Sequence, residues 1–112
     1  MSDGYVDIQI PGEAFARRGR LLAEAEASGP LPLLQVYDSF EYLLVAKRHS
    51  DGRVEHEEVW LSDDQCDGRC QPVTRRTKEE VAVDLRRFFG DEPRTEELVR
   101  EASAGWTGIR GL

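Results

Sequence analysis

Residues 33–61 read LLQVYDSFEYLLVAKRHSDGRVEHEEVWL, and this stretch decides the fold. Three runs rich in Val, Leu, Tyr and Trp are separated by short polar breaks: Leu33–Tyr37, Glu41–Ala46 and Arg53–Leu61. The last break contains Asp51-Gly52, a pair that favours a tight hairpin turn. The stretch therefore predicts an antiparallel meander that forms the nucleus of a single core.

Two segments before residue 33 bear on the size of this sheet. Tyr5–Ile10 alternates apolar Val6, Ile8 and Ile10 with polar neighbours, which predicts a half-buried strand. The composition of residues 13–28 favours a helix, whereas alternation in the second half of the segment favours a strand. Both interpretations stay open. We favour a strand over Arg20–Ala27 because the meander that follows would be extended by it.

The last third of the chain predicts helices after a polar loop at Ser62–Arg76. Thr77 and Glu80 have the spacing of a capping box. The helix then runs to Gly90, with one apolar face: Val81, Leu85, Phe88 and Phe89. A second helix is expected from Thr95 to about Ala104, with Thr95 as its cap and three residues inward: Leu98, Val99 and Ala102.

These elements predict an α+β fold: an antiparallel meander sheet of four to five strands with one or two C-terminal helices packed on one face. A chain of 112 residues suits a single domain over 1–112, with residues 105–112 as a candidate docking tail. We expect the helix to pack on alternate residues of the sheet, such as Val36, Leu43, Val45 and Val59.

Charge and hydropathy narrow the range of functions. The formal net charge is −7, so the chain lacks the excess of basic side chains that phosphate binding requires. We therefore expect no general nucleic-acid binding. There is no apolar run long enough to span a membrane, and no membrane partner is expected. The N-terminus lacks the features of a secretion signal, so a cytoplasmic location is expected. We expect a monomer or a homodimer.

The two cysteines of the polar loop suggest two kinds of site. Cys66 and Cys70 could supply half of a zinc site, with His49 and His56 as the other ligands. Alternatively, Arg69 could favour the thiolate of Cys70 and make the pair a redox switch. The spacing is not the usual one for zinc, and two ordinary thiols would give the same sequence.

We expect no enzymatic activity, because no catalytic triad, phosphate loop or dinucleotide fingerprint is present. His56 has acidic neighbours in Glu55, Glu57 and Glu58, which could raise the pKa of a general base. In a strand, however, only Glu58 of the three shares a face with His56.

The C-terminus contains Trp106, Ile109 and Leu112 at every third position, separated by glycines. These side chains either pack on the sheet or form a docking tail for another protein. We expect a small acidic protein-binding module (an inhibitor, an immunity or antitoxin-like protein, or an adaptor) that binds its partner through this tail and the carboxylates of Glu55, Glu57 and Glu58. The alternatives are a zinc- or redox-dependent regulator that uses Cys66 and Cys70, and a structural assembly subunit.

Overall fold

A computed structural model of the chain describes residues 4–26, 32–39, 41–63, 74–90 and 93–105. It contains nine elements in chain order: β1 (Tyr5–Ile8), β2 (Arg17–Glu26), β3 (Leu33–Asp38), β4 (Tyr42–Arg48), β5 (Val54–Trp60), β6 (Ser62–Asp63), β7 (Thr74–Arg75), α1 (Lys78–Phe89) and α2 (Pro93–Gly105).

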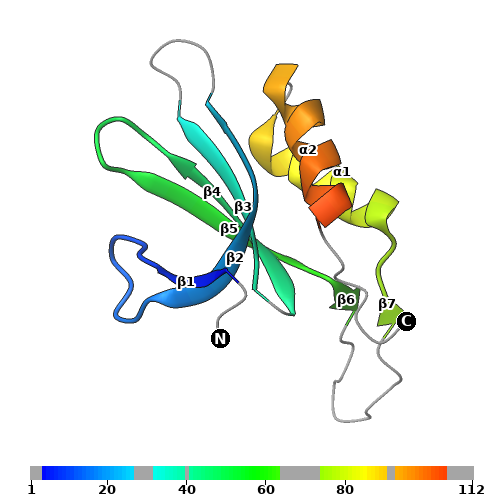
Figure 1. Cartoon of the computed structure of the whole chain (residues 1–112), viewed down its shortest axis with the longest axis horizontal. Helices are drawn as coiled ribbons and strands as arrows, with labels where there is room; N and C mark the ends of the chain where they lie inside the picture. Colours follow the sequence, from blue (N-terminus) through cyan, green and yellow to red (C-terminus); the bar gives the residue numbers. More distant parts are fainter. Residues whose placement is uncertain (1–3, 27–31, 40, 64–73, 91–92, 106–112) are drawn as a thin grey trace.

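The first five strands form one antiparallel meander sheet in the order β1-β2-β3-β4-β5. Both helices lie on the same face of this sheet, with α1 over β4 and β5 and α2 over β2 (Figure 1). The predicted α+β architecture is therefore confirmed, and within the segment that could be helix or strand, Arg17–Glu26 forms a strand.

The main core lies between the helices and the sheet. The apolar face predicted for the first helix packs on the strand residues predicted to receive it: Val36, Leu43, Val45 and Val59. Val81, Leu85 and Phe89 are buried there, and Phe88 is partly buried against the same cluster. Complete burial of side chains of this size contributes roughly 1.5–3 kcal/mol each before entropy is counted.

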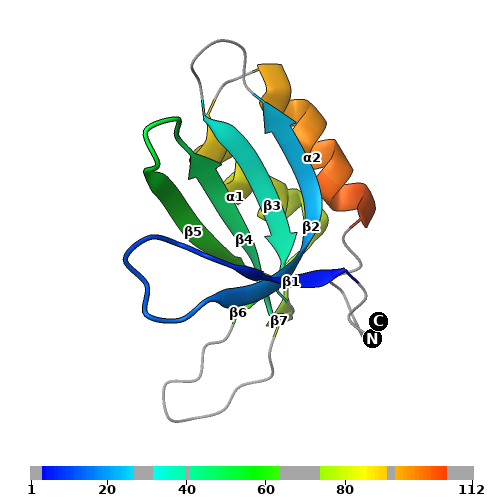
Figure 2. The same ribbon diagram turned by 60° about the vertical axis from the view of Figure 1, so that its left-hand side comes forward.

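A second, smaller core lies on the other face of the sheet, which we call the open face because neither helix covers it. Ile8 and Ile10 pack there on Tyr37 and Leu44. They reach this position because β1 and the beginning of β2 fold across the sheet, as Figure 2 shows. A β-bulge between Leu21 and Ala23 interrupts the pairing of β2 with β3 at the point where β2 changes direction.

Three details of the strands refine the expectations. Val6 is exposed, and only Ile8 and Ile10 of the alternating set are buried, because β1 is an edge strand that covers the sheet at one end. The ends of the predicted loop at 62–76 pair as the short strands β6 and β7, while residues 64–73 lie outside the described residues. The alternation of apolar and polar residues is interrupted at Glu57-Glu58, which indicates either a bulge or an exposed edge strand; the pairing of β5 with β4 is continuous and β5 is an edge strand, so the second explanation holds.

The predicted capping box of α1 is confirmed. The Thr77 hydroxyl accepts a hydrogen bond from the Glu80 amide at 3.2 Å, and the Glu80 carboxylate accepts one from the Thr77 amide at 2.9 Å. These two bonds satisfy amides that a helix start otherwise leaves unpaired. Gly90 ends the helix at φ 86°, a conformation that favours glycine.

Thr95 does not cap the second helix, because α2 already begins at Pro93. Proline suits the first helical position, where the missing amide costs no hydrogen bond. Thr95 is instead a buried residue of the first turn, 2% exposed, and its hydroxyl has no hydrogen-bond partner among the described residues.

We therefore expect Thr95→Val to raise the free energy of unfolding by about 1 kcal/mol, because a methyl group replaces a buried hydroxyl that lacks a partner. Urea denaturation of the two proteins measures the difference. A less stable variant would show that the hydroxyl has a partner elsewhere in the chain.

Candidate binding surface

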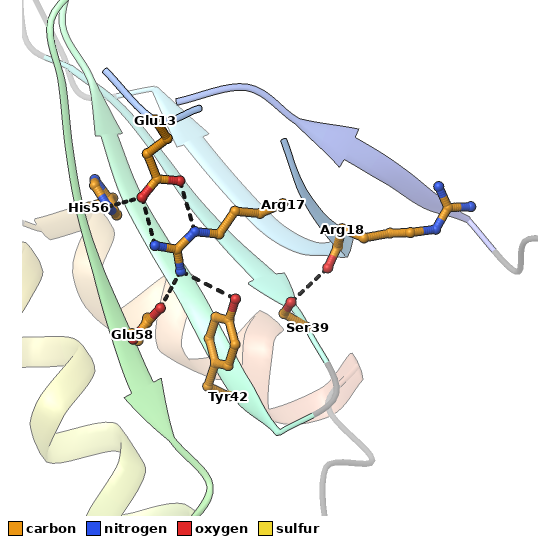
Figure 3. Close-up of polar contacts among 7 residues, drawn as sticks. All are labelled: Glu13, Arg17, Arg18, Ser39, Tyr42, His56 and Glu58. Atoms are coloured by element: carbon orange, nitrogen blue, oxygen red, sulfur yellow. Dashed lines mark hydrogen bonds and ion pairs between the residues drawn. The ribbon is translucent and has the colours of Figure 1, made fainter. Parts of the chain in front are cut away.

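The open face of the sheet holds a group of polar side chains where the segment between β1 and β2 approaches β5. Arg17, the first residue of β2, is at its centre (Figure 3). Its guanidinium donates to both carboxylate oxygens of Glu13, through Nε at 2.9 Å and Nη2 at 2.7 Å. Nη1 donates to the Tyr42 hydroxyl at 3.2 Å and to the Glu58 carboxylate.

We call Glu13, Arg17, Tyr42, His56 and Glu58 the Arg17 cluster. The Nε2 atom of His56 lies 3.4 Å from Glu13 Oε2. Members of the cluster come from β2, β4 and β5 and from the segment before β2. The ion pairs therefore hold this segment against the open face of the sheet, near β5. Two parallel bonds from one guanidinium to one carboxylate give this contact a fixed geometry.

The cluster is partly buried, and its charges affect one another. The hydrogen bonds from Arg17 hold the pKa of Glu13 below its ordinary value, and the charges of Arg17 and His56 act in the same direction. The hydrogen bond to Glu13 in turn raises the pKa of Arg17, which is charged at any physiological pH. The cluster therefore combines one permanent cation with the carboxylates of Glu13 and Glu58.

An aromatic surface lies beside the cluster. Phe15 is 85% exposed and lines, with Arg17 and Tyr42, a hollow of about 500 Å³. The Tyr42 ring packs on the ring of Trp60 with centroids 5.1 Å apart, and Trp60 is 45% exposed. The Arg17 guanidinium lies 5.9 Å from the centre of the Tyr42 ring. We call Phe15, Arg17, Tyr42 and Trp60 the aromatic surface.

The three glutamates predicted to bind a partner occupy different positions. Glu58 belongs to the Arg17 cluster on the open face, beside His56, as strand alternation predicts. Glu57 pairs across the strands with Val45 and is therefore on the helix side, where it is exposed. Glu55 is also exposed and lies 2.5 Å from His49 Nε2.

The structure does not bring the predicted zinc ligands His49 and His56 together. His49 contacts Glu55, whose cross-strand partner Lys47 approaches Phe88 on the helix side. His56 contacts Glu13 on the open face. The described ranges contain no group of three or more His, Cys, Asp or Glu side chains that could hold a metal ion. Cys66 and Cys70 lie outside the described residues, so the zinc and redox hypotheses stay predictions.

Gly105, the first residue of the predicted docking tail, is the last residue of α2, and residues 106–112 of the tail lie outside the described residues. This holds for all three of its apolar side chains: Trp106, Ile109 and Leu112. Their role as partner-binding residues stays a prediction.

Sequence reasoning missed the aromatic surface. Phe15 lies in the segment whose composition and alternation favour different structures, and as a helix residue it would have been one more apolar side chain. One signal was available: Phe15 is the single large apolar residue between Pro11 and Gly19. A lone aromatic residue among polar and small neighbours, just after a turn, is typical of an exposed contact residue.

A second hollow, of about 240 Å³, lies between β2 and α2 and is lined mainly by charged side chains: Glu24, Glu26, Arg94, Glu97 and Glu101, with Ala25 and Leu98. Arg94 and Glu97 form an ion pair at 3.1 Å. Charged groups that are solvated at the rim of a helix are common in acidic proteins, and this hollow offers no aromatic anchor.

No helix in the described part of the chain is both long and apolar enough to cross a membrane. Comparison of the chain with known proteins found no matching family model, no matching curated protein and no matching solved structure.

Proposed function

We propose that this chain is a small acidic protein-binding module that binds a basic protein partner through the aromatic surface. The observation that carries the proposal is the exposure of Phe15, 85%, beside the ring pair of Tyr42 and Trp60 and the Arg17 guanidinium. Aromatic and arginine side chains are the residues most enriched at the energetic centres of protein interfaces.

The Arg17 cluster supports this role because it fixes the contact residues in advance. Glu13 and Arg17 lie on either side of Phe15 in the chain and bind each other through two hydrogen bonds. A segment closed in this way loses less conformational entropy when a partner binds, and preorganised contacts raise affinity for that reason.

Charge indicates the chemistry of the partner. The chain carries a formal charge of −7, and the carboxylates of Glu13 and Glu58 adjoin the aromatic surface. These two carboxylates exceed the charge of the one guanidinium that binds them, so the surface keeps a negative charge that attracts arginine and lysine side chains, which also lie over exposed aromatic rings. A partner that is rich in these residues therefore fits this surface best.

The test compares Phe15→Ser with Val83→Ser, its matched control. Val83 is also an exposed apolar residue, 51% exposed, but it lies on α1, away from the open face. A partner isolated with the wild-type chain is purified, and its dissociation constant is measured with each variant. We expect Phe15→Ser to weaken binding by about ten-fold or more and Val83→Ser to leave it unchanged.

Equal affinity of the two variants for every partner isolated would contradict the proposal. Circular dichroism and urea denaturation of each variant exclude a general loss of structure as the cause of weaker binding. A partner whose binding is lost at high salt, yet does not respond to Phe15→Ser, would indicate attraction by net charge alone.

A further inference from the structure

β5 is the outermost strand at one end of the sheet (Figure 2), and its two sides differ in backbone pairing. The His49 amide donates to the Arg53 carbonyl at 2.8 Å, and the Leu61 amide donates to the Glu41 carbonyl at 3.1 Å. Hydrogen-bonded pairs alternate along an antiparallel ladder. The backbone groups of residues 53, 55, 57 and 59 therefore point to the β4 side, and those of residues 54, 56, 58 and 60 point outward.

Contacts at the end of β5 agree with this assignment. The outward carbonyl of Trp60 accepts a hydrogen bond from Arg76 Nη1 at 3.1 Å, so this end of the edge is occupied. Within the described ranges, no backbone group is hydrogen-bonded to the outward amides and carbonyls of His56 and Glu58. The middle of β5 thus presents amide and carbonyl groups in the geometry that an added strand would pair with.

The side chains of β5 determine which charge an added strand should carry. Glu57 is exposed on the helix side and has no ion pair among the described residues, whereas Glu55 and Glu58 are engaged by His49 and Arg17. If the added strand is antiparallel, Glu57 and the residue that faces it form a pair without backbone hydrogen bonds. Facing side chains come closest in pairs of this kind. A basic side chain at the facing position would pair with Glu57.

A second copy of the chain does not fit this edge. Antiparallel pairing of two β5 strands would bring glutamate-rich strands of two chains, each with a formal charge of −7, side by side. Like charges on neighbouring strands are destabilising, and charged edge strands are a common protection against self-association. The same negative charges would attract a strand with basic side chains.

We propose that the outer edge of β5 receives an extended basic segment of the protein partner as an additional strand. The inference rests on the proposed function and specifies how the partner docks. The edge and the aromatic surface are continuous, because Trp60 belongs to both, and Glu58 of β5 binds Arg17 of the aromatic surface. Side chains on the open face of the added strand would therefore adjoin Trp60, while those on its other face would meet Glu57.

The experiment uses the full chain, labelled with nitrogen-15, and a capped synthetic peptide of alternating arginine and threonine residues. Amide hydrogen exchange is measured by NMR with and without the peptide. We expect the peptide to slow exchange of the outward amides of His56 and Glu58 by about ten-fold or more, as hydrogen-bonded protection requires. The inward amides of Glu57 and Val59 should be protected in both states.

Two methylated peptides test the ladder itself. With the arginines facing Glu57, the threonine amides point to β5 and the arginine amides point away. N-methylation of the threonines should abolish binding, while N-methylation of the arginines should leave it nearly unchanged. Equal binding of both methylated peptides, or unchanged exchange of His56 and Glu58, would overturn strand addition. Loss of binding only on methylation of the arginines would overturn the pairing with Glu57.

Charge reversal tests the selection of a basic strand. We expect Glu57→Lys to weaken peptide binding by about ten-fold, while Glu101→Lys changes the net charge equally at an exposed site on α2 and has a smaller effect. Equal effects of the two variants would overturn the role of Glu57. Because these assays use no natural partner, the edge can fail them while the Phe15→Ser test succeeds, so the two proposals can be rejected separately.

Discussion

Gly19→Val should lower the free energy of unfolding by about 3 kcal/mol, and Gly19→Ala by about 1–2 kcal/mol. Gly19 is buried in β2, at the point where the beginning of this strand crosses the end of β3. A Cβ atom at this position would lie 3.1 Å from the carbonyl oxygen of Asp38, 3.2 Å from Tyr37 Cβ and 3.0 Å from Ile8 Cδ1. Two of these neighbours are backbone or β-carbon atoms and cannot rotate away.

A double-mutant cycle with Ile8→Val tests this explanation. Valine lacks the Cδ1 atom that would lie nearest to a Cβ at position 19, so part of the overlap disappears. Gly19→Ala should therefore cost less in the Ile8→Val background than in the wild type, although Ile8→Val alone costs about 1 kcal/mol. Urea denaturation of the four proteins gives the coupling energy. A Gly19→Ala variant as stable as the wild type would show that the strands do not cross this closely.

The elements that sequence alone predicts best are those determined by local patterns. Thr77 and Glu80 specify the start of α1, and the helical spacing of Val81 and Leu85 specifies its buried face. The meander follows similarly from short apolar runs and the Asp51-Gly52 turn. In each case the residues that determine the structure are close together in the chain.

Gly19 shows why β2 was harder to predict. In a helical interpretation of residues 13–28 it is only a destabilising residue, whereas in the structure it is required for close packing of β2 on β3. The reason is tertiary: the atoms that exclude a side chain at Gly19 belong to residues 8, 37 and 38. A pattern of neighbouring residues in the sequence cannot show that these atoms lie close to Gly19.

The Arg17 cluster could not be predicted for the same reason. Arg17 and Glu58 are 41 positions apart, and their contact depends on the bulge near Leu21 that turns the beginning of β2 across the sheet. The interrupted alternation at Glu57-Glu58 was visible in the sequence. It marks an edge strand with a polar contact on its open face, and what Glu58 contacts follows only from the fold.

Arg17→Leu should lower the free energy of unfolding by about 2 kcal/mol. The variant leaves the half-buried carboxylates of Glu13 and Glu58 facing each other without the cation that binds both, and the Tyr42 hydroxyl loses a donor. Arg18→Leu is the matched control. Arg18 is 57% exposed and pairs with the exposed Asp7, so its replacement should cost at most about 0.5 kcal/mol.

The pH dependence of this difference separates charge from packing. Arg17 lowers the pKa of Glu13 in the folded chain below the ordinary value of 4.5. A carboxyl group whose pKa falls on folding stabilises the fold above its unfolded pKa, and this stabilisation is lost as the pH falls through the folded pKa. The stability gap between wild type and Arg17→Leu should therefore be full at neutral pH and narrow below pH 4.5.

Carboxylates that Arg17 does not contact contribute equally to the stability of both proteins, so they do not change the stability gap. Asp51, Glu55, Glu80 and Glu96 also have lowered pKa values, but their partners are unchanged in the variant, so they destabilise both proteins equally in acid. Urea midpoints of the two proteins across the acid range give the gap directly. A gap that stays constant as the pH falls well below 4.5 would mean that Arg17 stabilises the fold by packing of its aliphatic portion, and that the ion pairs with Glu13 and Glu58 contribute nothing measurable.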